Sequence, residues 1–108
     1  MSDFFDDPRS RRSEELAHQA ERTRGDVAEC ERLFAEAAEL EEAVAREVPT
    51  TETRIRGVLA ISAVALWLKA RRFDLAQRAA ADFLKGRGIE GQDRADLESL
   101  ISSGAKAR

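Results

Sequence analysis

The longest apolar segment of the chain runs from Val58 to Leu68 and contains no charged residue. Ser62 is its only polar side chain, so a helix formed here is apolar on nearly every side. Such a helix is normally buried among other helices. At 1.5 Å per residue the segment would cover about 17 Å, well short of the ~30 Å hydrocarbon layer of a bilayer. The pattern therefore predicts a central, buried helix over about 52–70 and no membrane span.

A second apolar pattern lies just before this segment. From Val27 to Val48, apolar residues recur every three or four positions on an otherwise acidic stretch. This spacing is typical of an amphipathic helix. Asp26 and Glu29 have the spacing of a capping box at its start, and Pro49 ends it. We expect Thr50 or Thr51 to cap the helix that follows.

The segment before Asp26 predicts a shorter helix. Ser13 is a plausible N-cap, and the helix would end at about Thr23, with a weak apolar stripe. Gly25 interrupts the pattern, which favours two helices over 13–48, although one long helix through Gly25 would cost only about 1 kcal/mol relative to alanine. Both arrangements stay open at this stage.

The last third of the chain predicts two further helices. Leu75 to Leu84 forms one helix that turns small and aromatic residues inward, and the Gly86-Arg87-Gly88 stretch ends it. A short terminal helix follows at about 92–101. The sequence thus predicts an all-α domain of about five helices: two antiparallel helical hairpins and a short C-terminal capping helix. The domain would span 13–103, between a flexible arm over 1–12 and a flexible tail over 104–108, and the role of Phe4 and Phe5 stays open.

Charge is distributed unevenly along the chain. Residues 14–48 carry eleven acidic and four basic residues, a balance of −7, whereas residues 49–108 carry seven acidic and eleven basic residues, a balance of +4. The two halves would attract each other within the fold, attract another subunit, or attract separate partners. Because the whole chain is acidic and contains no recognition-helix motif, we do not expect nucleic-acid binding.

The sequence lacks the usual signatures of catalysis. No phosphate-binding glycine loop, zinc-protease motif or nucleophile elbow occurs, and His18 is the only histidine. Cys30 is the only cysteine and lies on the apolar stripe, which favours a buried hydrophobe in a reducing cytoplasm. Glu41, at the edge of that stripe, is expected to pair with an arginine. We therefore expect a cytoplasmic protein that is not an enzyme and needs no cofactor or metal.

The segment over 54–85 resembles a tetratricopeptide repeat, a helical-hairpin motif, of a bacterial type. The matching positions are an aromatic residue late in the first helix, an aromatic residue at the turn, a small residue in the second helix and a closing apolar residue: Trp67, Phe73, Ala76 and Leu84. The chain departs from the motif at Val64 and Arg71, where the motif prefers glycine or a small residue. The resemblance implies right-handed stacking of hairpins and a concave face that holds a partner segment.

The resemblance also implies which residues line that face. They are mostly apolar with a basic rim, and they include Val58, Ile61, Ala65, Leu68, Lys69, Arg71 and Arg72. We expect an adaptor domain that presents this apolar groove to a segment of a partner protein. The alternative is a self-associating structural subunit, a homodimer or larger assembly, that packs through the apolar faces of 27–48 and 55–68.

Overall fold

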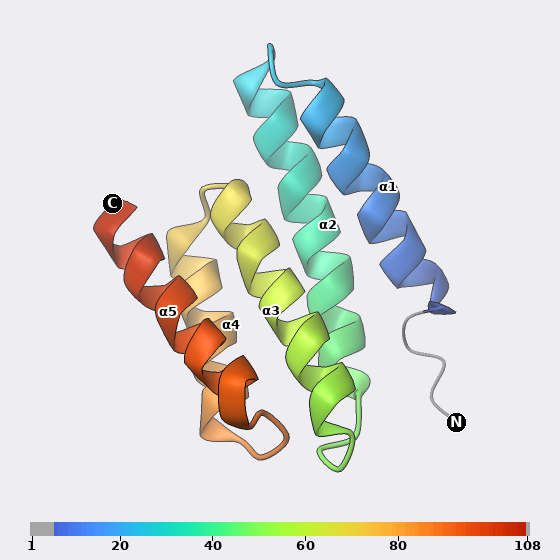
Figure 1. Cartoon of the computed structure of the whole chain (residues 1–108). Coiled ribbons are helices and arrows are strands. Elements are labelled where there is room, and N and C mark those ends of the chain that lie inside the picture. Colours follow the sequence, from blue (N-terminus) through green and yellow to red (C-terminus); the bar gives the residue numbers. More distant parts are fainter. Residues whose placement is uncertain (1–5, 108) are drawn as a thin grey trace.

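The computed structural model describes the backbone of residues 6–107 and the side chains of residues 6–103. Helices joined by short loops make up this part of the chain, and it contains no strand, which confirms the all-α prediction. Its helices are α1 (Pro8–Arg22), α2 (Val27–Glu47), α3 (Thr53–Lys69), α4 (Phe73–Lys85) and α5 (Gly91–Ala107) (Figure 1). Phe4 and Phe5 lie outside the described residues.

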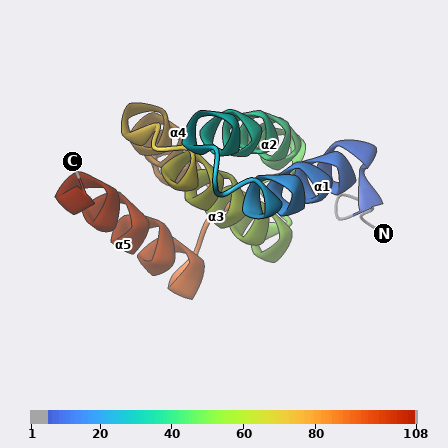
Figure 2. The same ribbon diagram turned by 90° about the horizontal axis from the view of Figure 1, so that it is seen from above.

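Helix α3 is the centre of the structure. It packs against α2, α4 and α5, while α1 packs against α2. Seen from above, α2 and α4 form one row, and α1, α3 and α5 form a second row in which α3 lies between α1 and α5 (Figure 2). Most of the apolar Val58–Leu68 run is therefore buried, as its composition predicts, although Val58 is 41% exposed.

Helix α1 begins at Pro8, not at the predicted cap Ser13. Asp7 is the N-cap, and its side chain accepts a 2.8 Å hydrogen bond from the backbone N–H of Arg9. Proline suits the first position of a helix because its φ is already helical and its missing N–H has no helical partner there. Ser13 is instead a buried interior residue whose Oγ donates to the carbonyl of Ala37 at 2.8 Å, which ties α1 to α2.

An arginine joins the start of α1 to the end of α2. The Arg9 guanidinium donates to both Asp7 and Glu47, with Nη1 2.7 Å from Glu47 Oε2. These bonds hold the pKa of Asp7 at about 2 and also lower the pKa of Glu47. Both carboxylates therefore stay ionised around neutral pH and keep the two helix ends together.

The break between α1 and α2 lies where the glycine predicts it. The Asp26 side chain accepts from the backbone N–H of Glu29 at 3.1 Å, so the expected N-cap forms. Glu29 uses its carboxylate to accept from Arg32. Residues 13–48 thus form parts of two helices and not one long helix.

The junction between α2 and α3 differs from the prediction. Glu52, not Thr50 or Thr51, is the N-cap of α3, and its side chain makes no capping bond. Arg56, in the first turn of α3, reaches back to the end of α2, where its Nη1 donates to the carbonyls of Ala45 and Val48 at 3.1 and 2.8 Å. The guanidinium therefore satisfies carbonyls that the helix end leaves free.

A tight turn joins α3 to α4. The N–H of Arg72 donates to the carbonyl of Trp67 and the N–H of Arg71 donates to that of Leu68, which is the pattern of a Schellman motif. Arg71 takes the left-handed position of this motif, with φ at 60°. A residue with a Cβ is strained there, and glycine is the usual choice.

Helix α5 extends to Ala107, beyond the predicted end at about 101. Its first turn lies very close to α3: the Asp93 side chain occupies the space that a Cβ at Gly57 would need. Ile89, in the loop before α5, is only 3% exposed and packs into the core together with Leu97. One continuous core thus includes buried residues from all five helices.

Candidate functional site

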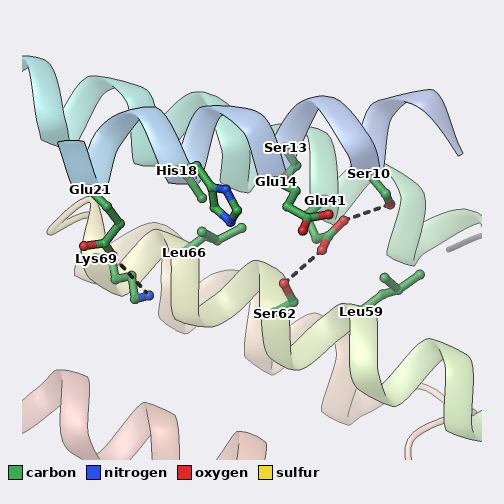
Figure 3. Close-up of a pocket in the computed structure, with 11 residues that line it drawn as sticks. Ser10, Ser13, Glu14, His18, Glu21, Glu41, Leu59, Ser62, Leu66 and Lys69 are labelled. Carbon is green, nitrogen blue, oxygen red and sulfur yellow. Dashed lines mark hydrogen bonds and ion pairs between the residues drawn. The ribbon is translucent and has the colours of Figure 1, made fainter. Parts of the chain in front are cut away.

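A pocket of about 560 Å³ lies between α1 and α3, with one residue of α2 in its wall (Figure 3). This volume is in the range of ligand-binding pockets. Its lining is mixed, with three acids, three hydroxyls, one histidine, one lysine and three apolar side chains: Ser10, Ser13, Glu14, Ala17, His18, Glu21, Glu41, Leu59, Ser62, Leu66 and Lys69.

The helical repeat places these residues on two facing surfaces. On α1 they recur every three or four positions from Ser10 to Glu21, and on α3 they recur in the same way from Leu59 to Lys69. Residues at this spacing share one face of a helix. Two helix faces of this kind, both touching α2, leave the pocket between them.

Glu41 is held between the two helices by hydroxyl groups. Ser10 on α1 donates to Glu41 Oε1, and Ser62 on α3 donates to Glu41 Oε2, both at 2.9 Å (Figure 3). The Glu41 side chain is half-buried. The arginine partner predicted for Glu41 is absent among the described residues, and the two serines take that place.

The carboxylates outnumber the cations around the pocket. Lys69 Nζ lies 3.9 Å from Glu21 Oε1, and this pair is exposed to solvent. Within residues 6–103, Glu14 and Glu41 form no ion pair. Three carboxylates against one lysine leave a formal charge of −2 when His18 is neutral.

Apolar side chains complete the pocket. Leu59 and Leu66 of α3 are buried to 3% and 8% exposure, and Ala17 of α1 is half-buried. Glu14 and His18 are exposed at the rim. The pocket therefore combines an apolar wall, a half-buried carboxylate and a rim that solvent can reach.

The apolar residues predicted for a partner-binding face lie beside this pocket. Val58, Ile61, Ala65 and Leu68 each precede a pocket-lining residue of α3 by one position, a rotation of about 100° around the helix. Val58 is 41% exposed, and the other three are half-buried. We call these four residues the α3 strip.

The predicted basic rim is divided between two places. Lys69 lines the pocket and its Nζ also lies 5.6 Å from the centre of the Phe34 ring. Arg71 and Arg72 are exposed in the turn after α3 and do not line the pocket. The structure thus brings only Lys69 of the three next to the acidic residues of α1.

Sequence reasoning missed the α1 side of the site. Nothing in the spacing of Ser10, Glu14 and His18 distinguishes them from an ordinary solvated helix face. The one available signal was Ser62, a lone hydroxyl in the apolar run of α3. A hydroxyl in such a position needs a hydrogen-bond acceptor, and Glu41 supplies it.

A smaller pocket of about 300 Å³ lies between α2 and α4. Several of its polar side chains already bond to one another. Trp67 Nε1 donates to Glu42 Oε1 at 2.8 Å, while Arg46 lies 2.7 Å from Glu42 and 3.1 Å from Asp82. Arg46 thus pairs with two of the acidic residues that line this pocket. This pocket is a weaker candidate than the one between α1 and α3.

Two further absences hold for the residues that the structure describes. No helix in this part of the chain combines the length and the apolar character needed to cross a bilayer. No group of three or more histidine, cysteine or acidic side chains there is arranged to hold a metal ion. Comparisons with models of protein families, with curated proteins and with solved structures find no match to this chain.

Proposed function

We propose that this protein is a non-catalytic binding scaffold that receives a segment of a partner protein on the face formed by α1 and α3. The observation that carries the proposal is the 560 Å³ pocket next to the α3 strip. A pocket with polar groups beside half-exposed apolar side chains offers both an anchor and a contact surface.

The arrangement of the helices is consistent with a tetratricopeptide-like fold. In that fold, the first helix of each hairpin lines a concave face, and the second helix forms the outer face. Here α1, α3 and α5 would be the inner helices, and α2 and α4 the outer ones (Figure 2). Ala76 is 2% exposed, as a small residue at a helix crossing should be.

Self-association is less well supported. The apolar face of 27–48 was one of its two proposed contact surfaces, together with that of 55–68, yet Leu33, Phe34 and Val44 are at most 5% exposed in the single chain. These side chains are already buried in the core and offer little surface to a second copy of the chain. We therefore propose the scaffold alone.

A selection from a random dodecapeptide library displayed on phage tests this function. The full chain is the bait, and the affinity of the enriched peptides is then measured in solution by fluorescence anisotropy. His18→Trp places a large side chain at the pocket rim, so it should weaken binding at least about tenfold, a loss of about 1.4 kcal/mol.

Gln19→Trp is the matched control for this experiment. Gln19 is the next residue on the same helix, is exposed, and does not line the pocket. It should leave the affinity within about twofold of the wild type. Failure to enrich any peptide, or peptides that bind both variants equally, would exclude the α1–α3 face as the binding surface.

A further inference from the structure

We propose that the pocket accepts a lysine or arginine side chain of the bound segment and that Glu41 is its charge partner. This inference rests on the proposed binding function and specifies the chemistry of the partner. It goes beyond an apolar groove, because it makes one cationic side chain the anchor of the complex.

The first argument is the unused charge of Glu41. Other carboxylates of α2 bind arginines: Glu29 and Glu36 bind Arg32, and Glu42 binds Arg46. Glu41 is half-buried and accepts only hydroxyl donors among the described residues. A half-buried carboxylate attracts a cation more strongly than an exposed one because less water screens it.

The second argument is geometric readiness. Each oxygen of Glu41 accepts one serine hydroxyl, from opposite walls of the pocket. An ionised carboxylate has about four acceptor positions, so two remain for an incoming ammonium or guanidinium group. The serines thereby hold the carboxylate in place without using up its capacity.

The third argument is the apolar wall. A lysine or arginine side chain has a long aliphatic stem below its charged head, and the stem is stable against apolar surface. Leu59, Leu66 and Ala17 provide such a surface in the same pocket. A small inorganic cation would gain nothing from these residues.

The α3 strip explains why the cation would belong to a protein segment. The strip adjoins the pocket on the same helix, and Val58 at one end of it is 41% exposed. Apolar residues on either side of the basic residue could cover the strip while the basic side chain enters the pocket. A free polyamine would leave the strip uncovered.

Peptide arrays test the inference directly. Each array holds nonapeptides with random flanks and one fixed central residue: arginine, lysine, citrulline, norleucine or glutamate. Citrulline has nearly the shape of arginine without its charge, and norleucine has the stem of lysine without its ammonium group. The full wild-type chain should bind the arginine and lysine arrays at least about tenfold more strongly than the neutral ones.

Two charge-removing variants complete the test. Glu41→Gln should reduce binding to the arginine and lysine arrays to the level of the neutral arrays. Glu39→Gln removes the same charge from an exposed position of the same helix outside this pocket, and binding should not change.

The outcomes separate the two proposals. Equal binding to all arrays, abolished by His18→Trp, would refute a basic anchor and leave the scaffold function in place. Binding that is absent, or that His18→Trp does not change, would refute both. If spermidine binds the wild-type chain as tightly as the best arginine peptides, the pocket takes free cations and the protein-segment inference is wrong.

Discussion

Arg71 is the residue whose backbone is least suited to its side chain. It occupies the left-handed position that ends α3, with φ at 60°, where glycine is the usual residue. An L-residue there costs about 1–2 kcal/mol. The guanidinium carbon of Arg71 lies 5.4 Å from the centre of the Phe73 ring, an exposed contact worth about 0.5–1 kcal/mol.

Replacing Arg71 should therefore stabilise the protein. We expect Arg71→Gly to raise the free energy of unfolding by about 0.5–1 kcal/mol, because the relieved strain exceeds the lost ring contact. Urea denaturation measures the change. Arg71→Ala is the control: it loses the ring contact and keeps the strain, so it should not stabilise. A stability gain for alanine equal to that for glycine would contradict the explanation.

Residues also show where sequence reasoning reached its limit. Asp26 as a cap and the buried Trp67 follow from local pattern, and both are confirmed. The predicted cap Ser13 was wrong, because a serine that suits a cap suits a buried bond to a carbonyl equally well. Only the position of α2 decides between these roles.

At the scale of elements, Arg56 connects three helices. The residue belongs to the first turn of α3, and its guanidinium caps the end of α2. The guanidinium carbon also lies 5.3 Å from the centre of the Phe83 ring of α4. Gly88, with φ at +100°, leaves room for it, since a Cβ there would lie 2.7 Å from the Arg56 side chain. Burial and the nearby Arg46 lower the pKa of Arg56.

Removing this connection should destabilise the fold. Arg56→Met keeps the stem and loses the donors, and we expect the free energy of unfolding to fall by about 2 kcal/mol, as for bonds from a charged donor. Thermal and urea unfolding measure it. Arg54→Met is the matched control: Arg54 is exposed on the same helix, and its replacement should stay within about 0.5 kcal/mol. Equal effects of the two changes would rule out the capping role.

The elements themselves were predictable because helix periodicity is a local signal. The pattern located both ends of α2 and of α4 to within two residues. The start of α1 and the end of α5 were missed because both lie in polar sequence, where periodicity is weak and capping decides. Asp7-Pro8 carried the necessary signal for α1, but the surrounding arginines and serines resembled a flexible arm.

At the scale of the whole molecule, one core joins all five helices. Leu97 of α5 is fully buried and belongs to the same cluster as Leu16 of α1. Leu97→Ala should lower the free energy of unfolding by about 2–5 kcal/mol. Native-state hydrogen exchange should show a similar loss of protection in α2 and in α5. Loss confined to α5 would show that the core does not unfold as a unit.

The candidate site forms only when the whole molecule is packed, which is why the sequence did not reveal it. Ser10, Glu41 and Ser62 come from three helices and are distant in sequence, so only packing brings them together. The residues of the α3 strip were expected only because the segment 54–85 resembles a helical-hairpin motif. That resemblance does not indicate the acidic residues of α1 that line the pocket.

The central position of α3 has a consequence for how this sequence can diverge. Its residues contact α2, α4 and α5 and also line the pocket with α1, so most substitutions in α3 must satisfy several neighbours at once. The outer faces of α1 and α2 carry no such constraint. Among related chains we expect α3 to change most slowly, and the segment from Thr53 to Lys69 is the best probe with which to recognise them.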